Sequence, residues 1–267
     1  MSCVLITGAA GGLGWALAQA FYHRGHSLLL TDLQQEDLSA RAGTLNKAPA
    51  HPQQRVLTLA GDITHEDHQQ SLLAMAREEL GGVSLLVNNA GITHRSLARQ
   101  TDPAVLAKVM AVDWQAPLTL ALGALPQLQQ HRGGMITIGS MAGWMPVLGR
   151  TGYCAAKAAL AQSFEVLRCE QMHHGVRLLM VYPSFIATPI EQNALGGDGR
   201  PARHPRSVAG RVQSAEWMAQ RIVTAWDKGH KRVYSDRFSR LASLLWRLAP
   251  DLYQRLMMRQ FAVELEQ

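Results

Sequence analysis

The sequence has few cysteines, and none of them forms a recognisable pair. Its 267 residues include Cys3, Cys154 and Cys169 but no CxxC motif. An odd, scattered set of thiols argues against a disulfide framework and is typical of a reducing compartment. No histidine or cysteine spacing typical of a metal site occurs either. We therefore expect a cytoplasmic protein that binds no metal.

Charged residues and long apolar runs are also scarce. Only 17% of the residues are charged and 47% are hydrophobic, a balance that argues against large disordered regions. No uninterrupted run of 18 apolar residues occurs, and an apolar strand pattern begins within three residues of the start. We therefore expect neither a transmembrane segment nor a signal peptide. The length suits one α/β domain over residues 1–267.

The net charge of +6 arises in the last quarter of the chain. Residues 199–267 carry 13 Lys and Arg against 6 Asp and Glu, whereas residues 1–198 carry 13 against 14. The arginines alternate with apolar residues at helical spacing, whereas a nucleic-acid groove would interleave them with aromatic residues. No nucleic-acid partner is expected.

Residues 237–265 have the pattern of two amphipathic helices that are interrupted at Pro250. Three interpretations remain open for this tail. The simplest is packing on the domain or at a subunit interface. The others are a wall for a lipophilic substrate and peripheral adsorption to an anionic membrane surface. The apolar positions are Phe238, Leu241, Leu245, Leu248, Leu252 and Leu256, and the arginines among them are Arg240, Arg247, Arg255 and Arg259.

Short apolar runs alternate with helical patterns before this tail. Strands are predicted at residues 3–7, 27–31, 56–60, 83–87, 135–138, 177–182 and 232–235. The order predicts an α/β fold: a Rossmann-type, doubly wound parallel sheet with helices on both faces and a C-terminal helical extension. Ligands of such sheets bind at the carboxyl ends of the strands. The polar segment 191–206 would form a mobile substrate loop over that edge.

A glycine-rich turn links the first strand to the first helix. Gly8, Gly11, Gly12 and Gly14, with Leu13 among them, follow the strand directly. Glycines in this context let the backbone approach a pyrophosphate, whose charge then lies at the helix N-terminus. The turn predicts a dinucleotide site.

The end of the second strand indicates which dinucleotide binds. Asp32 stands there, where a carboxylate accepts hydrogen bonds from a ribose diol and repels a 2′-phosphate. No basic residue occupies the glycine turn, and Leu33 and Gln34 follow Asp32. We therefore expect NAD, with NADP less favoured. Asp32 could instead cap the following helix, and one carboxylate can serve both roles.

Two further strand ends add candidate cofactor contacts. Asp62, followed by Ile63, ends the third strand and can accept a hydrogen bond from an adenine amino group, although a plain loop carboxylate is the alternative. Asn89, Ala90 and Gly91 end the fourth strand in a turn that suits packing against the cofactor.

The candidate residues for proton transfer follow the fifth strand and lie on the helix after it. Ser140 follows the strand, and Tyr153 and Lys157 lie four residues apart on one face of a helix predicted from residue 150 to about 172. A free phenol, with a pKa near 10, is a poor base, but a nearby ammonium favours the phenolate. Tyr153 could then exchange a proton with an alcohol or ketone whose oxygen Ser140 holds.

Asp113 is an unusual residue in the helix after the fourth strand. It lies between Val112 and Trp114, among other apolar residues. A carboxylate buried in mid-helix is costly unless it is paired or protonated.

Together these motifs resemble the classical short-chain dehydrogenase/reductase family over residues 3–190. The resemblance implies hydride transfer between a nicotinamide and a secondary alcohol or ketone, with Tyr153 as general acid/base and Ser140 as partner of the substrate oxygen. Lys157 would bind the nicotinamide ribose and lower the pKa of Tyr153. The segment after the sixth strand, with Pro183 and Ile186, would line the nicotinamide, and Thr188 would contact its amide. The matching motifs are Thr7-Gly8-x-x-x-Gly12-x-Gly14, Asp62, Asn88-Asn89-Ala90-Gly91, Ser140, Tyr153-x-x-x-Lys157 and Pro183 to Thr188.

The chain departs from the family pattern at two positions. The family usually has Asn in place of Asp113, and that Asn positions a water that links the lysine to solvent. A carboxylate there would pair with Lys157 and weaken its pull on Tyr153. The family also usually has Gly in place of Ser184, whose hydroxyl could reach the site. We count Asp113 among the candidate catalytic residues.

The resemblance also implies a homodimer or homotetramer. We expect the substrate to be a small to medium, apolar secondary alcohol or ketone. The main alternative is a catalytically silent nucleotide-sensing or scaffold protein, which the complete set of Ser140, Tyr153 and Lys157 disfavours. A sugar-nucleotide epimerase of the related extended family would also use Tyr-x-x-x-Lys. The glycine spacing and the short C-terminal region argue against it.

Overall fold

A seven-stranded parallel sheet forms the centre of the structure, a computed structural model that describes residues 2–47, 49–188, 190, 192–202 and 212–262. The strands lie in the order β3-β2-β1-β4-β5-β6-β9, so the chain reverses its direction of travel across the sheet between β1 and β4. Ligands bind at such a switch point, beyond the carboxyl ends of the strands. The strands are β1 (Cys3–Thr7), β2 (Ser27–Thr31), β3 (Val56–Thr58), β4 (Val83–Asn88), β5 (Gly134–Ile138), β6 (Arg177–Tyr182) and β9 (Arg232–Tyr234).

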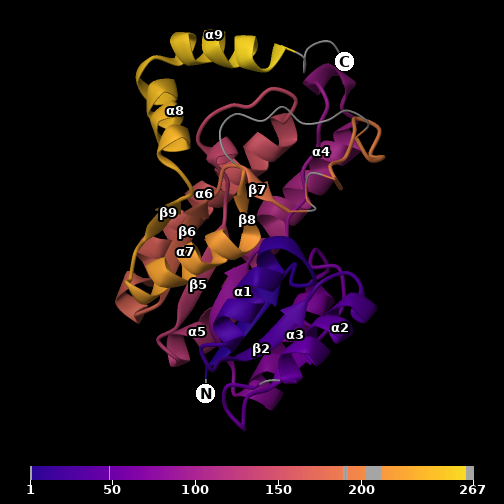
Figure 1. Ribbon diagram of the computed structural model, residues 1–267, viewed down its shortest axis with the longest axis vertical. Coiled ribbons are helices and arrows are strands. Elements are labelled where there is room, and N and C mark those ends of the chain that lie inside the picture. The colour runs from indigo at the N-terminus through magenta and orange to yellow at the C-terminus, as the bar shows by residue number, and fades with distance from the viewer. Residues whose placement is uncertain (1, 48, 189, 191, 203–211, 263–267) are drawn as a thin grey trace.

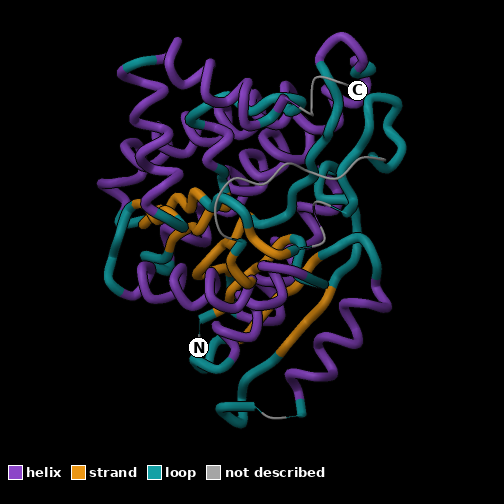
Figure 2. The backbone as a smooth tube through the Cα atoms, turned by 45° about the horizontal axis from the view of Figure 1, so that its top comes forward, coloured by secondary structure: helices purple, strands orange, loops and turns teal. Residues whose placement is uncertain are grey.

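Helices cover both faces of the sheet (Figures 1 and 2). One face packs against α1 (Gly12–Tyr22), α2 (Gln35–Asn46) and α7 (Ala215–Asp227). The other packs against α3 (Glu66–Leu80), α5 (Ala116–Gln130) and α6 (Thr151–Gln171). Because both faces are covered, the central strands are apolar on both sides, and β1 and β2 are buried throughout. The predicted doubly wound α/β fold is confirmed.

The predicted helix after the fourth strand is interrupted. It begins at α4 (Pro103–Met110), where the Asp102 carboxylate caps the N-terminus by accepting a hydrogen bond from the Ala104 amide. It then widens into a π-helical turn at Ala111–Gln115 and continues as α5. Such turns occur often at functional sites, and this one contains Asp113.

The continuous stretch Pro103–Gln130 is long and apolar enough to cross a membrane, with a mean hydropathy of 1.3. By length and composition, the expectation of no such segment was therefore too strict. In the fold, however, Leu120, Ala124 and Leu128 pack into the core beneath the sheet. The stretch therefore serves as a core helix here.

Several short elements connect the main strands and helices. They include a two-stranded parallel pair and three short 3-10 helices. The pair is β7 (Ile186–Ala187) with β8 (Gln213–Ser214), and the 3-10 helices are η1 (Ala98–Gln100), η3 (Met141–Gly143) and η4 (Met172–His174).

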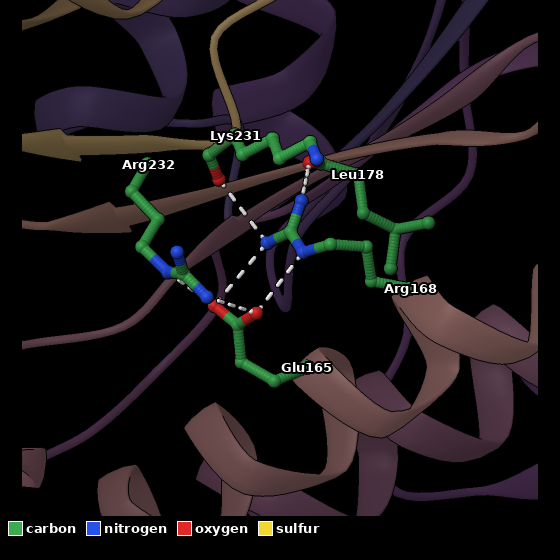
Figure 3. A network of polar contacts seen from close by, with 5 residues as sticks. All are labelled: Glu165, Arg168, Leu178, Lys231 and Arg232. Carbon is green, nitrogen blue, oxygen red and sulfur yellow. Dashed lines mark hydrogen bonds and ion pairs between the residues drawn. The ribbon is translucent and has the colours of Figure 1, made fainter. Parts of the chain in front are cut away.

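The C-terminal helices α8 (Arg237–Leu248) and α9 (Pro250–Gln260) leave the body at the end of β9 and form an arm (Figure 1). They confirm the predicted extension, although residues 263–265 of the predicted range lie outside the described residues. Strand β9, which leads into the arm, is tied to α6. There the Glu165 carboxylate pairs with Arg168 at 3.0 Å and with Arg232 of β9 at 2.6 Å (Figure 3). Arg168 also donates to the carbonyls of Leu178 and Lys231.

Candidate active site

A cleft of about 570 Å³ opens at the carboxyl edge of the sheet. Ser140, Tyr153 and Lys157 line it, together with every predicted cofactor residue except Gly14. Motifs separated by up to 180 residues therefore meet in one cavity. The predicted cofactor residues in its wall are Gly8, Gly11, Gly12, Leu13, Asp32, Leu33, Asp62, Ile63, Asn89, Ala90, Gly91, Tyr153, Lys157, Pro183, Ile186 and Thr188.

Close packing explains two of the glycines. Gly8 has φ +64°, and a Cβ there would lie 2.9 Å from the Ala90 Cα. A Cβ at Gly14 would lie 2.0 Å from the Gly8 carbonyl oxygen, although Gly14 is absent from the cleft wall. Gly14 therefore lets α1 pack closely on the turn, while Gly11, with open space beside it, lies at the cleft.

The Asn89 turn is fastened to the first strand. The Asn89 side-chain amide donates to the carbonyls of Thr7 and Gly8 at 3.0 and 3.1 Å. In return, the Thr7 hydroxyl accepts from the backbone amides of Asn89 and Ala90, both at 3.0 Å. These bonds hold the ends of β1 and β4 together at the switch point.

Asp32 lies at the cleft and is fixed by two backbone amides. Its carboxylate accepts from Ala10 at 2.9 Å and from Leu33 at 2.8 Å. The predicted role as a helix cap is not seen, because α2 begins without a side-chain cap. The sequence missed Arg41, whose Nε donates to the Ala10 carbonyl at 2.9 Å and whose guanidinium lies over the Trp15 ring. A basic group therefore does reach the glycine turn.

Asp62 lies at the cleft in a tight turn. One carboxylate oxygen accepts from both the amide and the hydroxyl of Thr64, at 2.9 and 2.7 Å. The hydrogen bond from the Thr64 amide is the largest of the effects that hold the pKa of Asp62 below its usual value. The carboxylate is therefore charged at neutral pH and can accept from a ligand amino group.

Ser140, Tyr153 and Lys157 come together where β5 ends and α6 begins. The Ser140 hydroxyl caps η3 by accepting from the Ala142 amide at 3.1 Å. On α6, the Lys157 ammonium lies 5.7 Å from the centroid of the Tyr153 ring. The ammonium also donates to the Ile138 carbonyl at 3.1 Å, so it is fixed to the end of β5.

Asp113 and Lys157 form a buried ion pair. Their charged atoms lie 3.2 Å apart, and the residues are 0% and 4% exposed. The second oxygen of Asp113 accepts from the Ile92 amide at 2.7 Å. The π-helical turn therefore presents the carboxylate to both the lysine and the turn after β4, and Asp113 does not itself line the cleft.

Burial and pairing act in opposite directions on the two groups. Burial lowers the pKa of Lys157, but the Asp113 carboxylate and the neighbouring Tyr153 more than offset this, so the pKa lies above its usual value. Burial raises the pKa of Asp113, and the lysine and the Ile92 amide offset only part of that effect. We conclude that Lys157 remains an ammonium at neutral pH as long as Asp113 faces it.

A family model described as short chain dehydrogenase matches residues 2–197. The chain belongs to this family. It is an NAD(P)-dependent oxidoreductase.

Curated relatives match most of the chain. It is 30% identical over 258 residues to dehydrogenase/reductase SDR family member 7B of Bos taurus, which covers 95% of this chain and 79% of the relative. It is also 30% identical over 228 residues to 2-(S)-hydroxypropyl-CoM dehydrogenase 3 of Xanthobacter autotrophicus, which covers 82% of this chain and 87% of the relative.

Solved structures of short-chain dehydrogenases share the fold. One from Burkholderia phymatum in complex with NAD has a TM-score of 0.81 at 21% identity, with 94% of each chain covered. One from Sphingobium yanoikuyae in complex with NADPH has a TM-score of 0.77 at 24% identity, and covers 96% of this chain and 95% of its own. Cofactors of both kinds therefore occur on this fold.

Replacing Asp113 by Asn, the usual residue of the short-chain dehydrogenases, should change the pH dependence of turnover. The carboxylate raises the pKa of Lys157, so without it the ammonium should lose its proton at lower pH. We expect Asp113→Asn to remain active near neutral pH and the alkaline fall of kcat to begin at lower pH. Steady-state kcat across pH measures this, with Asp67→Asn on the exposed start of α3 as control. An unchanged profile would contradict the role of Asp113.

Ser184, the second departure from the family pattern, lies at the cleft, but its hydroxyl points to the tail. It donates to the Asp236 carboxylate at 2.5 Å and contacts the Ser235 hydroxyl at 2.8 Å. Asp236 caps α8, accepting from the Ser239 amide at 2.6 Å. The substitution therefore links the turn after β6 to the base of the arm.

A buried histidine holds the start of the catalytic helix. His94 is 0% exposed, and its Nε2 accepts from the Gly152 amide at 2.8 Å, one residue before Tyr153. Burial, with a smaller contribution from Arg150, lowers the pKa of His94 to about 4, so the ring is neutral at neutral pH. The remaining ring hydrogen, on Nδ1, faces the Ser96 hydroxyl at 3.2 Å. No sequence signal marked this residue.

The described part of the predicted loop, residues 192–202, is docked beside this histidine. Leu195 donates its amide to the Thr93 carbonyl at 2.9 Å and accepts from the Arg95 amide at 2.7 Å. Gly197 accepts from the Asp102 amide at 2.8 Å. This is a more fixed arrangement than the predicted mobile loop, and residues 191 and 203–206 lie outside the described residues. The cleft wall also contains Thr93, Lys108, Val112, Ile190 and Asn193, which sequence reasoning did not single out.

Proposed function

We propose that the protein transfers a hydride between a nicotinamide and a small to medium secondary alcohol or ketone, with Tyr153 as general acid/base. One observation carries this proposal. The phenol, hydroxyl and ammonium of Tyr153, Ser140 and Lys157 line the same cavity as the glycine turn. That cavity is within the usual size range for ligand sites.

The residues present fit a nicotinamide dinucleotide. The turn at Gly11 leaves its backbone open to the cleft, at the N-terminus of α1, where a pyrophosphate is favoured. Asp62 and Asp32 line the cleft and would hold the adenine and its ribose, while Pro183, Ile186 and Thr188 would hold the nicotinamide. When bound, the cofactor supplies or accepts the hydride.

The protein's own groups would move the proton. In alcohol oxidation, Tyr153 removes the hydroxyl proton and the Ser140 hydroxyl holds the substrate oxygen. Lys157 favours the phenolate by its charge. In ketone reduction, Tyr153 returns the proton to the same oxygen. The hydrogen bond from Lys157 to the Ile138 carbonyl keeps the ammonium in place in both directions of the reaction.

The substrate class rests on the cleft and on one relative. Val112, Ile186 and Ile190 give part of the wall an apolar surface. The Xanthobacter relative is named for 2-(S)-hydroxypropyl-CoM, which carries a secondary alcohol. The test is a screen of steroids, 3-hydroxyacyl thioesters, polyols and simple secondary alcohols, followed by the absorbance of the reduced nicotinamide. Turnover of an apolar alcohol or its ketone supports the proposal. Cofactor binding without turnover of any member would instead favour a silent sensor.

NAD is the proposed cofactor, because the Asp32 carboxylate lies at the cleft, where it could accept hydrogen bonds from a ribose diol. Asp32→Asn removes the charge and keeps the shape. We expect the ratio of NADPH to NADH affinity to rise by about 10-fold or more, since a charge-assisted hydrogen bond contributes about 1.5 to 3 kcal/mol. Fluorescence titration with both cofactors measures the ratio. Asp62→Asn is the matched control, because it should weaken both cofactors equally. If Asp32→Asn leaves the ratio of NADPH to NADH affinity unchanged, the assignment of NAD through Asp32 is contradicted.

We also propose a homodimer or homotetramer in the cytoplasm. Leu122 of α5 and Val166 of α6 are 48% and 56% exposed, which favours a subunit contact over these helices. The thiols of Cys3, Cys154 and Cys169 are all free, as suits a reducing compartment.

A further inference from the structure

The apolar face of α8 points away from the protein. Phe238, Leu241 and Leu248 are 59%, 65% and 76% exposed. The face that packs against the body carries Ser239 and Ser243, which are 5% and 3% exposed. In a helix that only covers its own domain the order is the reverse, with apolar residues inside. Packing of the tail on its own domain therefore leaves the apolar face of α8 uncovered.

The second helix of the arm, α9, also carries exposed apolar side chains. Leu252, Leu256 and Met258 are each about half exposed. On its inner side, Tyr253 is buried and its hydroxyl donates to the Pro146 carbonyl at 2.8 Å. The arm is therefore seated on the body by a minority of its side chains, and Figure 1 shows it at one end of the molecule. We call the outward side chains of Phe238, Leu241, Leu244, Leu248, Leu252, Leu256 and Met258 the arm face.

The charge around the arm face is positive. Residues 237–260 contain five arginines and a single acidic residue, Asp251, a net charge of +4. The guanidinium groups of Arg240 and Arg247 lie over the rings of Tyr234 and Trp144, at 5.4 and 4.6 Å, and so flank the helix. On α9, Arg255 and Arg259 are exposed beside Leu252 and Leu256.

A bilayer containing anionic lipids matches both features. An apolar stripe flanked by arginines is typical of a helix that lies in the membrane interface, with its apolar side among the acyl chains and its cations near the headgroups. A second copy on the same face would bring +4 against +4, which disfavours self-association. We propose that the arm face binds peripherally to anionic lipid bilayers.

Contacts near the base of the arm fix the position of the arm relative to the cleft. The Asp236 cap of α8 is bonded to Ser184 at the cleft, and β9 is held to α6 by Glu165. The arm face therefore has a defined position relative to the cleft, and a docked molecule would hold the cleft near the bilayer surface.

Vesicle binding by the full chain tests the proposal. The probes are vesicles of phosphatidylcholine alone and of phosphatidylcholine mixed with phosphatidylserine, in a sedimentation assay at low and high salt. We expect binding to the mixed vesicles and its loss in high salt. Arg255→Gln with Arg259→Gln should weaken binding about 20- to 30-fold, from about 1 kcal/mol for each basic residue near the surface. Leu241→Gln with Leu248→Gln should abolish stable binding.

Matched substitutions elsewhere serve as controls. Met172→Gln removes an exposed apolar side chain beyond α6, and Arg77→Gln removes an exposed arginine of α3, and neither should change vesicle binding. All altered residues are exposed, so thermal unfolding and cofactor binding should remain normal. The proposal is overturned if mixed vesicles do not bind the protein, or if the arm-face variants bind as well as the controls. It is also overturned if the unsubstituted protein fails to bind mixed vesicles and light scattering shows that Leu241→Gln with Leu248→Gln dissociates an oligomer.

Discussion

Tyr153→Phe is expected to lower turnover by at least about 100-fold while cofactor binding remains. General acid/base catalysis contributes about 10²- to 10⁴-fold, and the phenol is the group placed to exchange the proton. The ring stays beside Lys157, so its packing on α6 is kept. Single-turnover kinetics with a substrate from the screen, together with an NADH titration, separate the two effects.

Tyr22→Phe provides the matched control for that experiment. Tyr22 is a fully buried phenol at the last residue of α1, and its hydroxyl has no hydrogen-bond partner among the described residues. Loss of this oxygen should leave both turnover and stability unchanged. If Tyr153→Phe retains more than a few per cent of turnover, the proton is moved by another group and the role assigned to Tyr153 is wrong.

Lys157→Met is expected to have a large effect on stability as well as on turnover. It leaves the Asp113 carboxylate buried without its cation, and breaking a buried pair on one side costs about 3 to 5 kcal/mol. Burial raises the pKa of Asp113, and a carboxyl whose pKa is higher in the folded state stabilises the fold at low pH and loses that contribution as pH rises. The deficit in the free energy of unfolding should therefore grow from about pH 4 toward neutral pH.

Urea unfolding across pH measures this deficit. The double variant Asp113→Asn with Lys157→Met removes both charges and should recover most of the lost stability, although it stays inactive. Both partners are removed there, so no buried charge is left without a partner. A single Lys157→Met variant that is as stable as the double variant would mean that Asp113 is already neutral in the native protein.

The sequence predicted the fold because its signals are local. Strands β1, β2 and β6 have the predicted bounds, since each is an apolar run between turn residues. The Asp102-Pro103 pair marked the start of α4 correctly for the same reason. The cleft residues could be grouped because the carboxyl ends of parallel strands share one edge.

Contacts between distant residues were beyond such reasoning. The π-helical turn at Asp113, the approach of Arg41 to the glycine turn and the bond from His94 to Gly152 depend on how elements pack. The periodicity of the tail predicted its helices but not which side faces outward. Its small buried residues, Ser239 and Ser243, look like polar positions when only the sequence is considered.

The buried His94 has a consequence for engineering. Its ring and backbone join the residue-93 segment, the start of α6 and the docked segment around Leu195, three stretches that are far apart in the chain. A graft that exchanges residues 192–202 alone for those of another dehydrogenase would therefore disrupt the contacts that His94 makes with these segments. The transplantable unit comprises that segment, residues 93–96 and residues 149–152 together, and chimaeras designed on this boundary should keep Tyr153 in register.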